Sequence, residues 1–184
     1  MGLIDKFFGS KKTITSVLIN TQNNIFKHYG VHQPTDAQKM KASVYLCISG
    51  MAIINHLGGG RLRNEIDALV NETRELTKPL NMRVDELSNN NEQLEKILAD
   101  FPAEAQVTSA TRVNGLAAFE ALYFSMVEEL MSDILAHTGG PMGAPGYASI
   151  VVADGIFGEG KSKEHFMEIS MELLNFTKEL AEVI

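Results

Sequence analysis

Apolar side chains recur at three- and four-residue steps along most of this chain, which is the spacing of amphipathic α-helices. The first such stretch runs from about residue 12 to 29, and Gly30 supplies a stop because glycine readily adopts the left-handed conformation that ends helices. Thr35 and Gln38 form a capping-box pair, so a second helix is expected to begin there and to continue to about Leu57.

The rest of the chain predicts further helices, separated by breaks rich in glycine, proline and asparagine. Pro79 is expected to end one of them, because the residue before a proline avoids helical geometry. No sustained alternation of apolar and polar residues with hairpin signals occurs, so we predict an all-α fold. We expect a single-domain bundle of about seven to eight helices. The later segments are 62–79, a short piece near 84–87, 94–101, 112–137, 147–157 and 162–183.

Length and composition favour one domain. A chain of 184 residues with 45% hydrophobic residues is long enough for one well-filled core and short for two. We assign residues 12–184 to the helical domain and residues 1–11 to a basic amphipathic arm. The uncharged stretch 42–60 contains Ser, Asn and His, which makes it too polar to span a bilayer, so no transmembrane segment is expected.

Charge is unevenly distributed. The chain carries −7 overall, yet residues 1–41 contain six Lys and two Asp and carry +4, which leaves −11 on the remainder. This acidic body argues against a nucleic-acid binder, because phosphate binding needs a clustered basic surface. Cys47 is the single cysteine and lies in an apolar run, so we interpret it as a buried hydrophobe. With no recognisable secretory signal, a cytoplasmic location is expected.

The arm combines four apolar residues with lysines. Leu3, Ile4, Phe7 and Phe8 lie around Lys6. Through residues 1–12 it could make weak peripheral contact with an anionic membrane or dock on a protein partner. The alternative is that it folds back on its own bundle or swaps onto the second subunit of a homodimer.

Two glycine-basic turns lie one hundred residues apart. Residues 58–80 and 158–180 share six identities in twenty-three positions, and their apolar positions coincide. The similarity predicts a pseudo-duplicated helical unit, although two amphipathic helices share such periodicity by default.

Both turns are candidate anion sites. Backbone N–H groups at a helix start attract anions, whereas cations in a first helical turn are unfavourable unless an anion compensates them. The alternative is that the turns are solvent-exposed loop tips whose basic residues promote solubility. The candidate residues are Gly58, Gly60, Arg61, Arg63, Gly158, Gly160, Lys161 and Lys163.

A second candidate site is acidic. Glu129, Asp133 and His137 are spaced by four residues, which places them on one helical stripe, and carboxylates with imidazole suit a divalent metal. The alternative is a solvated helix face. No cofactor motif is identified, so a divalent metal is the one cofactor considered.

Ala153-Asp154-Gly155, followed by Glu164 and an amphipathic helix, resembles the helix-turn-helix repeat of TerB-like tellurite-resistance domains. That resemblance implies an all-α bundle of two such units, with a metal bound near Asp154 and Glu164. The first copy departs from the pattern, since residues 55–58 read Asn-His-Leu-Gly and lack the Asp-Gly pair.

Two functions follow from these patterns. No catalytic set emerges and amphipathic helices dominate, which favours a non-enzymatic helical interaction or regulatory module acting on a protein partner or by self-association. The alternative is a domain that binds a metal or small anion, with a hydrolytic activity that the sequence does not reveal.

Overall fold

The computed structural model describes residues 12–58, 63–87, 118–139 and 143–183, with side chains left out at 81–87, 118–122 and 124–125. These ranges contain six α-helices, one 3-10 turn and no strand, which confirms the all-α prediction. The elements are α1 (Ile14–His28), α2 (Asp36–Gly58), α3 (Arg63–Leu87), α7 (Ala118–Ala136), α8 (Gly143–Phe157), η1 (Lys161–Lys163) and α9 (Phe166–Val183).

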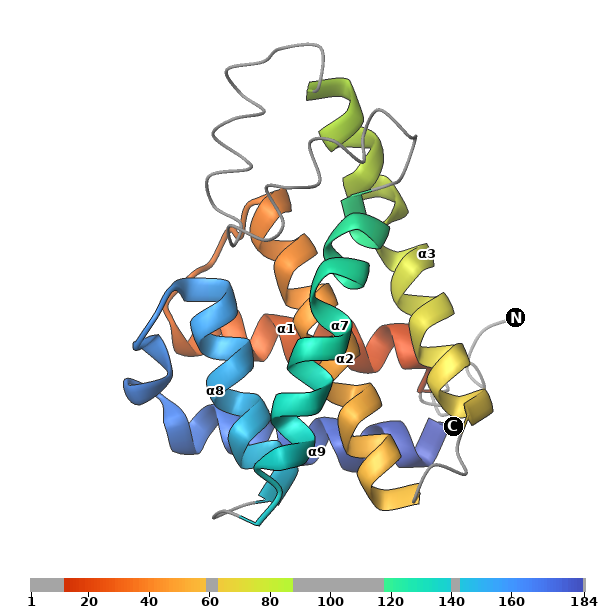
Figure 1. The fold of residues 1–184 in the computed structure, drawn as a ribbon. Coiled ribbons are helices and arrows are strands. Elements are labelled where there is room, and N and C mark those ends of the chain that lie inside the picture. The colour runs from red at the N-terminus through yellow and green to blue at the C-terminus, as the bar shows by residue number, and fades with distance from the viewer. Residues whose placement is uncertain (1–11, 59–62, 88–117, 140–142, 184) are drawn as a thin grey trace, which may run out of the picture.

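The long helix α2 is the centre of the bundle (Figure 1). It packs against α3, α7 and α8, while α1 and α9 run side by side and antiparallel across the more upright helices. Every residue of α2 from Met40 to Ile54 is buried, as the uncharged stretch that begins at residue 42 predicts. None of the helices in the described ranges combines the length and apolarity needed to cross a membrane.

The ends of the first two helices follow local sequence. Gly30 has a φ of +67°, the left-handed geometry predicted for the stop after α1. Before α2, the Thr35 N–H donates to Gln38 Oε1 at 2.9 Å and the Gln38 N–H donates to Thr35 Oγ1 at 3.2 Å, so the predicted capping box is confirmed. A second capping box joins Thr13 and Ser16 at the start of α1 and was not predicted, because its third residue is Ser rather than Glu or Gln.

The predicted end of the third helix at Pro79 is wrong. α3 continues through Pro79 to Leu87. Proline removes one N–H donor and so leaves the carbonyl of Glu75 without its helical partner. Pro79 and Glu75 both lie on the exposed face of α3, where water can hydrate that carbonyl, so the break is avoided.

Two later boundaries differ from those predicted. α8 begins at Gly143, four residues before Tyr147, because Pro145 in the first turn needs no hydrogen-bond partner for its nitrogen. α9 begins at Phe166 instead of Ser162, because residues 161–163 form the 3-10 turn η1. The predicted segment 94–101 and residues 112–117 of the long helix lie outside the described residues, as does the arm 1–11.

Candidate functional site

The second glycine turn is held by hydrogen bonds inside the chain. Gly158 and Gly160 have φ angles of +107° and +82°, which favour glycine at both positions. The Ser162 N–H donates to Asp154 Oδ1 at 2.6 Å, and the Tyr29 hydroxyl donates to the carbonyl of Lys161 at 2.8 Å. The turn is therefore fixed to both α8 and α1.

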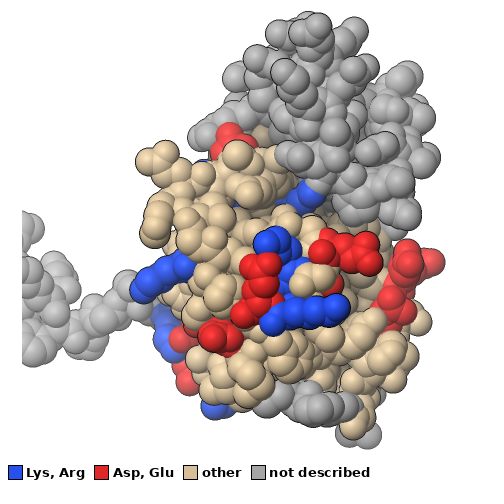
Figure 2. Space-filling model, turned by 90° about the vertical axis from the view of Figure 1, so that its left-hand side faces the viewer, with Lys and Arg blue, Asp and Glu red and all other residues tan. Residues whose placement is uncertain are grey.

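Several of the backbone donors predicted for an anion at this turn already bond within the chain. The N–H groups of Lys161 and Lys163 donate to the carbonyls of Gly158 and Gly160, at 3.2 and 3.3 Å. Lys161 Nζ also lies 2.6 Å from Glu164 Oε1. On the face shown in Figure 2, basic side chains alternate with acidic ones, so no single-sign patch forms there. An anion at this turn would compete with these hydrogen bonds for the N–H groups of Lys161 and Lys163.

The first glycine turn is described only at its edges. Gly58 is the last residue of α2 and Arg63 the first of α3, whereas Gly60 and Arg61 lie outside the described residues. Duplication of the helical unit stays a prediction. The two copies share one local feature. Thr77 and Thr177 each donate their hydroxyl to the carbonyl four residues earlier, at 3.0 and 2.8 Å.

The structure does not bring the predicted metal ligands together. No group of three or more potential ligands gathers anywhere in the described ranges. His137 Nδ1 lies 2.7 Å from the carbonyl of Asp133, and its ring stacks on Tyr147 with centroids 4.1 Å apart, while Glu129 is exposed. Asp154, in the last turn of α8, instead holds the backbone of η1.

Cys47 is a packing residue. Burial raises the pKa of its thiol to about 12, so it is protonated at neutral pH and is a poor nucleophile. The prediction of a small buried hydrophobe is confirmed.

A cluster absent from the sequence predictions joins α1 to the start of α9. The ring of Tyr29 stacks on Phe157 at 4.0 Å and meets His165 edge-on at 4.9 Å. Nearby, His28 Nε2 lies 3.3 Å from Glu172 Oε1. The other carboxylate oxygen, Glu172 Oε2, accepts a hydrogen bond from Asn24 Nδ2. These residues come from segments more than one hundred positions apart, so their spacing carried no signal. They fasten α1 to α9.

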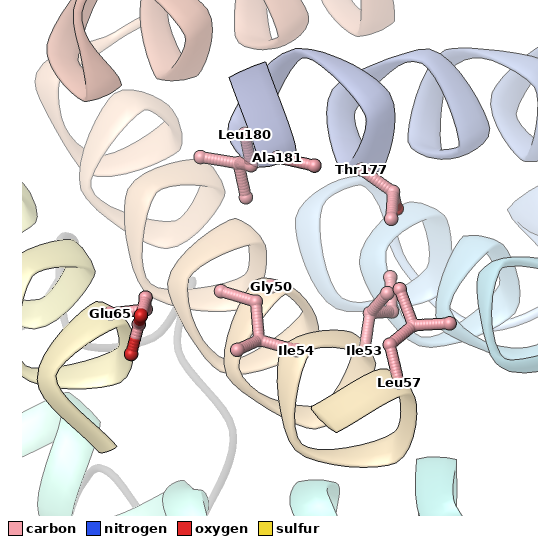
Figure 3. A pocket seen from close by; sticks show the side chains of 8 residues that line it. All are labelled: Gly50, Ile53, Ile54, Leu57, Glu65, Thr177, Leu180 and Ala181. Atoms are coloured by element: carbon pink, nitrogen blue, oxygen red, sulfur yellow. The ribbon is translucent and has the colours of Figure 1, made fainter. Parts of the chain in front are cut away.

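An apolar hollow lies between α2, α3 and α9 (Figure 3). It has a volume of about 210 Å³. Side chains of α9 face those of α2 across it, and Glu65 of α3 stands at one side. We call it the α2–α9 groove. It is lined by Gly50, Ile53, Ile54, Leu57, Glu65, Thr177, Leu180 and Ala181.

The floor of the groove exists because residue 50 lacks a side chain. A Cβ at Gly50 would lie 2.7 Å from Leu69 Cδ2 and 3.2 Å from Phe176 Cε1, so α3 and α9 both close on α2 at this point. At the rim, Leu57 is 67% exposed. An apolar side chain in that position is a signal of a contact surface when it adjoins an apolar hollow.

The groove has one charged wall residue. Among the described residues, no hydrogen-bond or ion-pair partner is found for the Glu65 carboxylate. The hydroxyl of Thr177 is bonded to its own helix and adds little polarity. The groove thus suits an apolar group that carries a positive charge beside it. It was not predicted, because it depends on how three helices cross.

No protein-family model, curated protein or solved structure matches this chain.

Proposed function

We propose that this chain is a non-enzymatic interaction module, and that its α2–α9 groove binds apolar side chains of a polypeptide segment. The observation that carries this proposal is the pairing of an open apolar groove with the exposed Leu57 on its rim. An amphipathic helix placing its apolar face between two helices is a recurrent mode of peptide recognition. Glu65 supports the choice of a segment with Lys or Arg beside its apolar residues.

The partner in this proposal is a protein or a second copy of the chain, and the location is the cytoplasm. Binding at the groove requires neither a similarity to TerB-like domains nor a metal bound near Asp154.

The experiment is fluorescence anisotropy with a fluorescein-labelled amphipathic peptide of Leu, Phe, Lys and Ala. Two variants address the groove: Leu57→Lys removes the apolar rim, and Ala181→Trp fills the space. Both positions are exposed, so both proteins should fold. We expect each variant to weaken binding about tenfold or more, the loss typical of a buried contact residue.

The matched control is Met167→Lys. Met167 is 58% exposed on α9 and does not line the groove. It should bind the peptide as the parent chain does. Saturable binding with this pattern supports the proposal, whereas no binding, or equal losses for Leu57→Lys and Met167→Lys, would overturn it.

A further inference from the structure

We propose that the groove has an occupant within the same molecule: the arm, through its apolar residues Leu3, Ile4, Phe7 and Phe8. This inference rests on the proposed function, because it assigns the first segment that the groove recognises. It also gives the arm a place on the bundle that lies next to its point of attachment.

Chain continuity brings the arm to the groove. Lys12, the first described residue, places its Nζ 3.0 Å from Glu182 Oε2 and 3.3 Å from Glu179 Oε1. Leu180 and Ala181, between these two glutamates, line the groove. Glu179 and Glu182 lie on the face of α9 that points away from the groove. The arm therefore leaves the bundle at the same turn of α9 that forms one groove wall and must pass around that helix to reach the groove.

The other wall is close as well. The Thr15 hydroxyl donates to Glu72 Oε2 at 2.5 Å, which fixes the start of α1 on α3. Glu65, at the groove, precedes Glu72 on the same helix by seven residues, or about 10 Å at 1.5 Å per residue. The beginning of α1 thus stands near both α3 and α9.

The segment between Phe8 and Lys12 is long enough to reach the groove and short enough to favour docking within one molecule. Four residue steps separate Phe8 from Lys12 and reach at most about 14 Å, which exceeds the ~10 Å diameter of a helix. The steps between include Gly9 and Ser10, which permit a change of direction. A short flexible tether gives an effective concentration in the millimolar range, so docking within one molecule outcompetes exchange between dilute copies.

Charge and apolar spacing are complementary. In helical spacing, Leu3 and Phe7 fall on one face, as do Ile4 and Phe8. Lys6 lies among them and supplies the positive charge that suits Glu65. An external segment must then displace the arm, so the arm lowers the apparent affinity of the groove for a partner.

The test is disulfide trapping in the full chain. We pair Phe7→Cys with Leu57→Cys and, as a matched control, Phe7→Cys with Glu182→Cys, because Glu182 lies beside Lys12 and does not line the groove. Both second positions are well exposed, at 67% for Leu57 and 63% for the Glu182 side chain. Native Cys47 is buried and stays unreactive. Intact mass and peptide mapping under non-reducing conditions identify the bridge.

A disulfide requires Cα atoms within about 7 Å, so only a docked arm should join residue 57 efficiently. We expect a monomeric chain with a 7–57 bridge, formed about tenfold faster or more than the 7–182 bridge, because docking holds residue 7 at the groove rather than beside its point of attachment. Equal rates for the two pairs would overturn the proposal. A 7–57 bridge found only between two chains would overturn the same-molecule docking in favour of a swapped dimer.

Peptide binding separates this inference from the proposed function. The full-length variant Leu3→Asp/Phe7→Asp should bind the labelled peptide more tightly than the parent chain, because the groove is vacated. If the peptide binds at Leu57 but no 7–57 bridge forms, the function stands and the arm proposal is overturned. If the 7–57 bridge forms but Leu3→Asp/Phe7→Asp binds no peptide, the docking of the arm is supported and the proposed function is overturned.

Discussion

Gly155 of α8 lies directly against the ring of Tyr45 on α2. A Cβ at Gly155 would overlap Tyr45 Cζ and would lie 2.5 Å from each ring Cε atom. Tyr45 is 5% exposed, so its ring is enclosed by the core and has little room to move. The close crossing of α2 and α8 therefore depends on glycine at this position.

We predict that Gly155→Ala lowers the free energy of unfolding by about 1–3 kcal/mol, the usual cost of overpacking. This loss should outweigh the ~1 kcal/mol by which Ala is favoured over Gly inside a helix. Denaturant unfolding measures it, with Gly139→Ala as control because no atom lies within 4 Å of a Cβ there. Equal stability of the two variants would contradict the close packing.

Ser49 and Ser43 of α2 offer a matched pair. Both are buried, but within the described part of the chain no partner is found for Ser49 Oγ, whereas Ser43 Oγ accepts Gln22 Nε2 at 2.6 Å. Ser49→Ala should raise the free energy of unfolding by about 1 kcal/mol, because an unsatisfied buried hydroxyl is removed.

Ser43→Ala should instead lower stability by about 1–2 kcal/mol, since it leaves Gln22 without its acceptor. Chemical unfolding of both variants checks the contrast. A stability loss of the same size for Ser49→Ala would show that its hydroxyl has a stabilising partner.

Tyr29 should make the fold sensitive to alkaline pH. Burial raises the pKa of its phenol to about 12, and the carboxylates of Glu164, Asp154 and Glu168 add to the rise. In the unfolded chain the phenol titrates near pH 10. Between these values the folded state holds more protons than the unfolded state, so the stabilising contribution is complete below about pH 10 and is lost as pH rises toward 12.

The measurement is the free energy of unfolding against pH for the parent chain and Tyr29→Phe. The variant should lose about 1 kcal/mol at neutral pH, because the hydrogen bond to the Lys161 carbonyl is removed. It should also show a shallower decline above pH 10. Identical pH profiles would place the titrating group elsewhere.

Local signals in the sequence predicted the ends of α1 and α2 well. Gly30 and the pair Thr35 and Gln38 act on neighbouring backbone, so their effect does not depend on the rest of the fold. The end predicted at Pro79 was wrong because a proline breaks a helix less readily where the freed carbonyl is exposed to water. The periodicity of apolar residues does not show that exposure. The start predicted for α9 at Ser162 was wrong because the N–H of Ser162 donates to Asp154, eight residues earlier in the chain.

The candidate site was harder to predict than the helices. Leu57 was expected as the end of a buried helix, and its exposure becomes evident only when α3 and α9 are placed around it. The acidic stripe was predicted from spacing along one helix. Asp133 and His137 do share a face, but helical spacing places ligands along one helix and supplies none from a second.

Pro79 remains inside a helix and should therefore limit stability. Proline is about 3 kcal/mol less favourable than Ala in a helix interior, so Pro79→Ala should stabilise the chain by up to roughly that amount. Thermal unfolding measures the gain. Lys78→Ala, at the exposed neighbouring position, should change stability by less than ~0.5 kcal/mol. A loss of stability in Pro79→Ala would mean that proline fits a local bend at this point.

Asp154 distinguishes a structural carboxylate from a metal ligand. Its Oδ1 accepts the Ser162 N–H at 2.6 Å, and asparagine presents an equivalent oxygen without the charge. If the residue serves the turn, Asp154→Asn should retain most of the stability, while Asp154→Ala should lose about 1–3 kcal/mol. Melting temperatures with and without EDTA complete the test. If Asp154 has a structural role, EDTA should not change the melting temperature of the parent chain or of either variant. A melting temperature that EDTA lowers in the parent chain and leaves unchanged in both variants would instead make Asp154 a metal ligand, as the resemblance to TerB-like domains implies.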